Sequence, residues 1–274
     1  MEKLEQHTHF LQSNHWQAFQ EALGRKIITD SGDDWSFTAQ LEQGRKNSRL
    51  SVPYGPVVEN ESAFLAAHAA LLKQAKRENA TFFRIEPISG VSATKLLSLG
   101  YRKVSYQQLN PSRTLVVDLT KPLDELFHDM KQNTRNIIRN YQKKDVSIHI
   151  STDPSDVSHL LRLLHGVSKR THLSPHSEHY LKTQAEILLK RGAGKIYLGY
   201  YQDKVIATSL LFDDGHTVYY AHAAADDSQR KLHAGTALLG QAILDAKNDG
   251  RHSFDLFGIA PENEPDHPWN GFTK

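Results

Sequence analysis

The sequence predicts an α/β protein in which mixed β-sheets are flanked by helices. Helix-like and strand-like patterns alternate along all 274 residues. Hydrophobic residues make up 39% of the chain and charged residues 23%, as in ordinary globular proteins. One helix–strand pattern also occurs twice. A chain of this length can bury a sizeable core, so it needs no disulfide or metal ion for stability.

The first part of the chain contains alternating elements. Residues 16–23 place apolar side chains at helical spacing and end before Gly24, which favours a helix stop. Residues 49–58 resemble a strand interrupted by a Pro-Tyr-Gly-Pro turn. Three further segments complete this part: a helix over 62–77, a strand over 81–87, and a short helix and strand over 95–106 divided by Gly100.

The second part continues the alternation with longer elements. A strand over 113–119 precedes a long helix over 124–144, with a break expected near Asn133–Thr134. The remaining segments are strands over 146–150, 216–224 and 253–259, a hairpin of 195–201 and 205–212, and helices over 157–169, 180–190 and 236–247.

Two segments share one plan. The sequences AALLKQAKRENATFFRIEP, from Ala69, and TALLGQAILDAKNDGRHSFDLFG, from Thr236, each run from a Leu-Leu helix into an aromatic strand. Each strand has one acid at its centre, Glu86 or Asp255. This similarity indicates two copies of one α/β unit, with chance similarity as the alternative. We place the domains at 1–110 and 111–274.

Composition limits the classes of function. The chain has 33 basic and 31 acidic residues, a net charge of +2, so binding of anions depends on local patches. It has no cysteine, which excludes thiolate zinc sites, iron–sulfur clusters and a cysteine nucleophile. The polar start, MEKLEQHTHF, has no signal-peptide core, and no segment approaches the ~20 apolar residues of a membrane span. We therefore expect a soluble, cytoplasmic protein.

A basic stripe occupies the predicted helix after residue 130. Its cations recur every four residues and so lie on one helical face, and no acid stands between them. Such a stripe is either a solvated surface or a binding site for RNA or phosphate, because unneutralised cations repel one another. The stripe consists of Lys131, Arg135, Arg139 and Lys143.

The segment SQRKLHAGTALL, from Ser228, stands between a strand and a helix, where backbone N–H groups can hold a phosphate. It resembles the acetyl-CoA-binding loop of the GNAT acetyltransferases, which generally reads (Arg/Gln)-x-x-Gly-x-(Gly/Ala). Here the inner glycine is replaced by Leu232 or His233, depending on the alignment. A side chain at that position obstructs close approach of a pyrophosphate. The segment therefore favours a GNAT fold without favouring CoA.

Histidines are frequent, with 16 in the chain. His172, His176 and His179 are close in sequence, but Pro175 interrupts the helix that would align the first two. We therefore predict no metal site.

Two other polar positions are candidates for binding. Tyr220 and His222 are two residues apart on a predicted strand, so they should face the same side and either line a polar pocket or pack in the core. Arg170 follows a helical segment and is either a surface arginine or a clamp for phosphate or carboxylate.

Several segments together resemble the Fem family of peptidoglycan aminoacyltransferases (the FemABX group). The resemblance covers nearly the whole chain. Its most specific parts are the MKQNTRNIIRNYQKKDV stretch from Met130 and the final DLFGIAPENEPDHPWNGF stretch. The other parts, in order, are FLQSNHW, VPYGPV, FRIEP, LGYRK and YYAHAAA.

The resemblance implies two tandem GNAT-like domains and, because no long heptad segment is present, no coiled-coil insertion. It implies transfer of an amino acid from aminoacyl-tRNA, as co-substrate and without another cofactor, to an amine of the peptidoglycan stem peptide. The acceptor would be a UDP-muropeptide or lipid II, and lipid II would bring the protein to the membrane surface. Such an enzyme would serve cell-wall synthesis.

The resemblance also implies site residues. Arg170 matches an arginine near the muropeptide phosphates, and Glu86 matches an acid that contacts the stem peptide. Tyr220 and His222 fall where the family often has Tyr-x-Tyr, so His222 is a departure. Tyr54, in VPYGPV, joins them as a substrate-binding candidate. A catalytic Phe-Lys pair of the family is expected just beyond Lys274, which would make this chain truncated.

The chemistry is attack of an amine on an ester, for which the sequence offers no convincing general base. Three alternatives remain open. One is an acyl-CoA-dependent GNAT N-acyltransferase. Another is a non-catalytic module that binds tRNA or muropeptide. The last is a transferase acting on protein N-termini, since leucyl/phenylalanyl-tRNA–protein transferases share the double-GNAT design.

Overall fold

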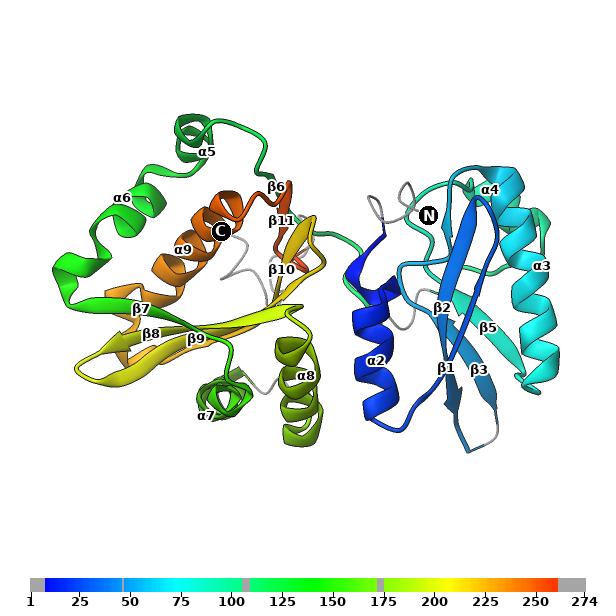
Figure 1. Ribbon diagram of the computed structural model, residues 1–274, viewed down its shortest axis with the longest axis horizontal. Coiled ribbons are helices and arrows are strands. Elements are labelled where there is room, and N and C mark those ends of the chain that lie inside the picture. Colours follow the sequence, from blue (N-terminus) through cyan, green and yellow to red (C-terminus); the bar gives the residue numbers. More distant parts are fainter. Residues whose placement is uncertain (1–7, 46, 105–108, 172–174, 261–274) are drawn as a thin grey trace. The chain divides into compact units, whose positions relative to one another are not determined.

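The computed structural model describes residues 8–45, 47–104, 109–171 and 175–260. The chain divides into two compact units, Met1–Asn110 and Pro111–Lys274. Each unit has one mixed β-sheet flanked by helices (Figure 1). The predicted α/β class is therefore confirmed, and none of the described helices forms a coiled-coil insertion.

The first unit contains a sheet in the order β1-β2-β3-β5, with β4 paired to β2. Neighbouring strands are antiparallel except β3 and β5, which are parallel and joined through helix α3. Such a parallel pair requires a crossover connection, which α3 supplies. The elements are β1 Lys26–Ser31, β2 Trp35–Gln43, β3 Ser48–Val52, β4 Val57–Val58, α3 Glu61–Arg77 and β5 Phe82–Ile85.

Helices cover both faces of this sheet. Helix α3 buries Leu71 against Phe37 and Leu50, so its apolar stripe forms a core between the helix and the sheet. On the other face, the buried Gln12 exchanges hydrogen bonds with the backbone of Thr38 and also donates to the Pro53 carbonyl. The remaining helices are η1 Phe10–Gln12, α2 Asn14–Ala22 and α4 Ala93–Ser98.

The second unit contains a six-stranded sheet in the order β6-β11-β10-β9-β8-β7. Again only one pair, β10 and β11, is parallel, and it is joined through η4 and helix α9. The elements are β6 Val116–Asp118, β7 Val146–Ser151, β8 Gly194–Tyr201, β9 Lys204–Asp213, β10 Thr217–Ala225, η4 Asp227–Leu232, α9 Ala234–Asn248 and β11 Ser253–Asp255.

Helix α9 lies on one face of this sheet, and α7 and α8 lie on the other (Figure 1). The core on the α9 face includes Leu211, Leu238 and Phe254. The other helices are α5 Leu123–Asp129, α6 Gln132–Asn140, η2 Tyr141–Lys144, η3 Pro154–Asp156, α7 Val157–Thr171 and α8 Glu178–Lys190. Within the described residues, no helix has the length and apolar character needed to cross a bilayer.

The structure corrects several predicted boundaries. The break in the long helix falls at Met130–Lys131, between α5 and α6, rather than near Asn133–Thr134. Arg135 stabilises this break because one of its guanidinium nitrogens donates to the carbonyls of Phe127, His128 and Met130, 3.0–3.1 Å away. The strand expected over 113–119 is confined to β6. Residues 101–104 form no strand, and 105–106 lie outside the described residues.

Candidate functional site

A β-bulge in β10 changes which side chains share a face of the sheet. Tyr219 pairs with Phe212 of β9, and His222 pairs with Leu210. Two residues, Tyr220 and Ala221, therefore lie opposite the single residue between them on β9. The expectation that Tyr220 and His222 face the same side is wrong, because the extra residue reverses the alternation.

Tyr220 and His222 have different surroundings. Tyr220 is buried in the core of the α9 face, beside Phe254, and burial raises its pKa. His222 lies on the opposite face, where its ring contacts the edge of Phe212. Its Nε2 lies 2.8 Å from Gln184 Oε1 in α8. Tyr220 is thus a core residue, whereas His222 belongs to a polar cluster.

His222 is held in its neutral form. Burial, and to a smaller extent the nearby His176, lowers its pKa from 6.5 to about 3. The two imidazole rings meet edge to face with their centroids 5.7 Å apart, and His176 also stacks on Tyr180. The neutral imidazole donates its Nε2–H to Gln184 Oε1. This hydrogen bond orients the ring and leaves a lone pair on Nδ1.

Asp255, the last residue of β11, lies beside Tyr219 in the parallel pair. It is 8% exposed. Its Oδ1 accepts hydrogen bonds from the Thr114 hydroxyl and, at 2.7 Å, from the Phe257 N–H. Burial raises the pKa of this carboxyl, although both hydrogen bonds oppose the shift. Both hydrogen bonds that the carboxyl group forms with described residues end on Oδ1.

The sheet opens next to Asp255. Strands β10 and β11 pair over three residues only, 217–219 with 253–255. The chain then leaves β10, because the Leu256 and Ile259 N–H groups donate to the carbonyls of Leu115 and Arg113. Phe257 (φ 59°) and Gly258 (φ 141°) make this turn. We call the opening between β10 and the chain after Asp255 the fork.

The far arm of the fork is the second half of β10. From Ala221 to Ala225 this strand has β9 as its only strand neighbour in the described part of the chain. Such an edge presents backbone groups that an extended ligand can pair with. Phe257 borders the same opening and contacts the rings of Tyr219 and Phe212, each 5.8 Å away.

The segment expected to bind phosphate forms η4 and the start of α9. His233 adopts a left-handed conformation (φ 55°) at the amino end of α9, and no side chain caps that end. His233 therefore occupies the position at which a glycine would be least strained.

Arg170 lies near the end of α7 and is tied to η4. Its Nη1 lies 2.7 Å from Asp227 Oδ1, and both side chains are about half exposed. The structure thus places Arg170 against η4. Its predicted contact with a muropeptide phosphate remains a prediction.

Part of the basic stripe has an internal role. Arg135 binds the end of α5, as described above, and the Arg139 guanidinium lies 4.9 Å from the centre of the Phe127 ring. Lys131 precedes α6 and is exposed. The prediction of an RNA or phosphate surface here remains open, but two of the four stripe residues, Arg135 and Arg139, contact the end of α5.

In the first unit, the structure brings Tyr54 and Glu86 together. The Glu86 N–H donates to the Gly55 carbonyl at 2.9 Å, and Tyr54 (φ 51°) stacks on His9. Each carboxylate oxygen of Glu86 has a partner: Arg84 at 3.3 Å and the Asn110 amide at 2.6 Å. These groups form a polar cluster just after β5.

A hollow of about 520 Å³ lies at the hairpin end of the second sheet. That size is typical of sites for small molecules. Two tyrosines, Tyr200 and Tyr201, line it together with Arg162 and Lys204. Arg162 uses one nitrogen to donate to the Val205 carbonyl at 2.6 Å. The lining also includes residue 159 of α7, residues 202–203 of the hairpin turn, and residues 205, 206, 226, 228 and 229.

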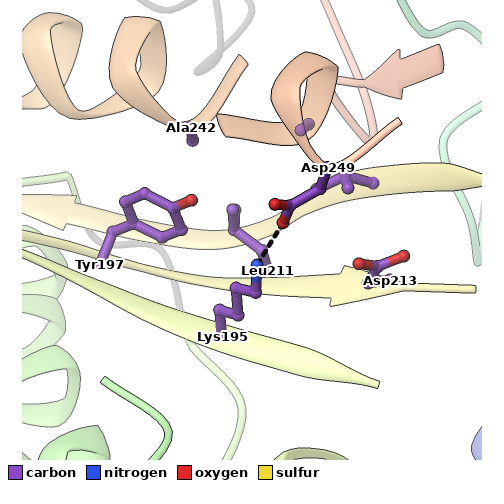
Figure 2. A pocket seen from close by; sticks show the side chains of 8 residues that line it. Lys195, Tyr197, Leu211, Asp213, Ala242 and Asp249 are labelled. Carbon is purple, nitrogen blue, oxygen red and sulfur yellow. Dashed lines mark hydrogen bonds and ion pairs between the residues drawn. The ribbon is translucent and has the colours of Figure 1, made fainter. Parts of the chain in front are cut away.

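A second cavity, between β8, β9 and α9, is too small for an organic ligand. Its volume is about 10 Å³, room for at most one water molecule. Figure 2 shows Lys195 reaching across it to Asp249, with 2.6 Å between the charged atoms. Tyr197 and Asp213 also line it, and they bond to Asp245 and Arg251. This polar cluster stabilises the packing of α9 on the sheet.

No cluster of potential metal ligands occurs in the described ranges. His172 lies outside those ranges, as do Lys274 and the expected position of the terminal Phe-Lys pair. The prediction that the chain has no metal site therefore remains a prediction for the chain as a whole.

Sequence reasoning did not identify Tyr219 as a residue of the site. It also did not show that Asp255 lies where β10 and β11 separate. The repeated helix–strand pattern marked Asp255 as the counterpart of Glu86, but it could not show where β10 and β11 separate. Period-two alternation selected Tyr220 instead of Tyr219, because a bulge leaves no clear mark in a run such as YYAHAAA.

Comparison with known proteins adds to this description. Residues 128–267 match the family model described as an acetyltransferase (GNAT) domain. No curated protein sequence matches the chain significantly.

Three solved structures share much of the fold. FemX superposes with a TM-score of 0.84 at 15% identity, over 98% of this chain and 89% of FemX. The C-terminal domain of a putative lysylphosphatidylglycerol synthetase from Agrobacterium fabrum has a TM-score of 0.58 at 14% identity, covering 94% and 77% of the two chains. A conserved protein of unknown function from Bacteroides thetaiotaomicron has a TM-score of 0.52 at 13% identity, covering 87% and 78%. The predicted Fem-like, double-GNAT fold is thereby confirmed.

Proposed function

Because this chain belongs to the acetyltransferase (GNAT) domain family, we propose that it transfers an acyl group to an amine, and that the acyl group is an amino acid carried by tRNA. The acceptor is an amine of a peptidoglycan stem peptide, as in the Fem family that the sequence resembles. The similarity to FemX in fold supports this choice.

The observation that carries the proposal is the fork. It combines a strand edge and a buried carboxyl group within one unit. Acyl transfer from an activated ester needs an acceptor held in position and a route for the proton that the amine loses. An extended peptide can pair with the edge of β10, and Asp255 lies at the point where the strands part.

The choice of RNA as donor is supported by two features. The left-handed residue before α9 is His233, whose side chain obstructs the close approach of a CoA pyrophosphate to the backbone. The hollow beside η4 is lined by two tyrosines and by two cations, Arg162 and Lys204, together with two acids, Asp203 and Asp226. Its rings and cations suit the bases and phosphates of single-stranded RNA. Two more cations, Arg230 and Lys231, stand in the last turn of η4.

The first unit supplies a second polar cluster for the acceptor. The Glu86 N–H donates to the carbonyl of Gly55, the residue after Tyr54, so Tyr54 and Glu86 lie close together. The ion pair with Arg84 orients the Glu86 carboxylate. A carboxylate fixed in this way can accept hydrogen bonds from the amide or ammonium groups of a peptide. We assign this cluster to recognition of the stem peptide.

The direct test mixes the protein with charged tRNA and either a UDP-muropeptide or lipid II. Mass spectrometry should show an acceptor heavier by one amino-acid residue, and RNase treatment of the tRNA beforehand should abolish the product. Product that forms with acetyl-CoA alone, after RNase treatment, would show the proposal to be wrong.

The hollow gives a sharper test of the RNA donor. Changing Lys204→Gln should raise KM for charged tRNA about 3- to 10-fold and make the salt dependence of binding shallower, because a phosphate contact is lost. Tyr201→Leu should raise KM by a similar factor through lost stacking. The control is Lys73→Gln, which removes an exposed cation from α3 of the first unit. Equal effects of Lys204→Gln and Lys73→Gln would count against RNA in the hollow.

An acyl-CoA-dependent N-acyltransferase is the second candidate function, because the matching family model is that of an acetyltransferase. Titration calorimetry with acetyl-CoA distinguishes the two. We expect no heat of binding at millimolar acetyl-CoA, whereas micromolar affinity would favour the second candidate.

A further inference from the structure

We propose that Asp255 is the proton acceptor of the transfer reaction, acting through its Oδ2 atom. This inference rests on the proposed function and adds a general base, the role for which the sequence showed no candidate. It follows from the position of Asp255 at the fork and from the asymmetry of its hydrogen bonds.

The reaction is balanced as follows. The acceptor amine, after its ammonium form has lost one proton to solvent, attacks the ester carbonyl and forms the C–N bond. The second N–H proton passes to Asp255 Oδ2, and the ester C–O bond breaks. The leaving ribose oxygen then takes the proton back from Asp255. The products are an amide and a free hydroxyl group, and the carboxylate is regenerated.

The two oxygens of Asp255 have different tasks. Oδ1 accepts from the Thr114 hydroxyl and from the Phe257 N–H, so it fixes the carboxyl group and helps to form the turn that opens the fork. Oδ2 has no hydrogen bond to any residue in the described part of the chain. A carboxyl group with one anchored and one open oxygen is oriented and still able to bind a proton.

Its surroundings favour proton uptake. Burial raises the pKa of Asp255, which makes the carboxylate a stronger base than an exposed aspartate. The neighbouring elements carry few charges near it. Strand β10 presents Tyr219, whose hydroxyl is donated to Asp214, and the segment before β6 presents Arg113 next to Thr114. No charged group contributes to the shift of the pKa of Asp255.

A structural role is the alternative explanation for Asp255, and the isosteric change Asp255→Asn separates the two. Asparagine keeps an oxygen at Oδ1, so it can still accept from Thr114 and from the Phe257 N–H. It replaces Oδ2 by an amide nitrogen, which cannot take a proton. We expect kcat to fall at least about 100-fold, the usual effect of losing a general base, with KM within about 3-fold of the wild-type value.

A second pair of variants tests the basicity of Asp255 without removing it. Thr114→Val deletes a donor that holds the pKa of Asp255 down, so this pKa should rise. The carboxylate is the active form, and activity is therefore lost as the pH falls through that pKa. The acid limb of the kcat–pH profile should move to higher pH in Thr114→Val and stay in place in Thr114→Ser, which keeps the hydroxyl donor.

The outcomes are distinguishable. Wild-type protein that makes no product from charged tRNA overturns the proposed function and, with it, this inference. Active wild type with an Asp255→Asn variant that keeps kcat within about 5-fold overturns the role of Asp255 alone. If Asp255→Asn fails to fold by circular dichroism, the Thr114 pair decides: an unmoved acid limb in Thr114→Val overturns the inference, and a shifted limb supports it.

Discussion

The two units contain the same β–α–β arrangement, but the chain takes a different course after the second parallel strand. In the first, β3 and β5 are parallel and α3 connects them; in the second, β10 and β11 are parallel and α9 connects them. An acid stands at or just after the end of the second parallel strand in both. Glu86 directly follows β5, and Asp255 is the last residue of β11, so neither is at a strand centre as predicted.

The difference lies in what happens after the acid. In the first unit the strands stay connected, because the Glu86 N–H donates to the Gly55 carbonyl beyond β3, and both carboxylate oxygens of Glu86 are bonded. In the second unit the chain turns away after Asp255, and one carboxylate oxygen carries both hydrogen bonds. The same topology thus gives a closed, oriented acid in one unit and an open, basic one in the other.

The connecting helix of the second unit, α9, packs tightly against α6. Gly240 of α9 packs so closely on Ile138 of α6 that an added Cβ would overlap the isoleucine side chain. Gly240→Ala should destabilise the second unit by about 1–2 kcal/mol, because the overpacking cost of about 1–3 kcal/mol is only partly offset by the higher helix propensity of alanine. Urea unfolding followed by hydrogen exchange should show the loss in the second unit and none in the first.

The control for Gly240→Ala is Gly166→Ala in α7. Gly166 is exposed, and an added Cβ there meets nothing within 4 Å. This variant should stabilise the helix by about 0.5–1 kcal/mol, since alanine favours a helix more than glycine. Equal effects of the two variants would mean that α9 is not held tightly against α6.

A smaller effect is expected from the matched change of the other acid, Glu86→Gln. The amide keeps one oxygen for hydrogen bonding but loses the charge that attracts a peptide amine. KM for the acceptor should rise about 5- to 10-fold, equivalent to about 1 kcal/mol, with kcat little changed. A fall in kcat as large as that expected for Asp255→Asn would show that the two acids do not divide recognition from proton transfer.

Sequence reasoning could predict these acids but not their difference. The order of helices and strands and the duplication follow from hydrophobic periodicity and repeated motifs, which report local structure and burial. The double-GNAT class comes from the resemblance to the Fem family. Arg135 shows where such reasoning ends. Its spacing from Arg139 predicts that both point to the same side of α6, and both contact α5. Whether such a cation meets a ligand or the carbonyls of α5 depends on tertiary packing.

The bulge in β10 illustrates the same limit at the site itself. A single extra residue moves Tyr220 into the core and leaves Tyr219 and His222 on one face. Alternation predicts faces only while the register holds, and the register is set by the neighbouring strands. The fork likewise depends on hydrogen bonds between segments more than 100 residues apart, such as Thr114 and Asp255.

The smallest predicted effect concerns the histidine that each unit keeps neutral. Burial lowers the pKa of His9 and of His222 from 6.5 to about 3. His9 Nδ1 accepts the Leu11 N–H at 3.2 Å, so protonation at that atom would break the bond. A histidine whose pKa is lowered on folding binds its proton more readily in the unfolded chain. Its stabilising contribution is complete above pH 6.5 and decreases steadily as the pH falls from 6.5 toward 3.

We expect this loss to reach about 1 kcal/mol for each histidine by about pH 5.8, measured as the free energy of unfolding in urea. His222→Gln should reduce the acid dependence of the second unit, because glutamine can bond to Gln184 without titrating. His165→Gln, an exposed position in α7, is the control and should leave the dependence unchanged. If the slope in the second unit persists in His222→Gln, other groups set its acid sensitivity. His222 would then not contribute to acid sensitivity in the second unit as His9 is expected to do in the first.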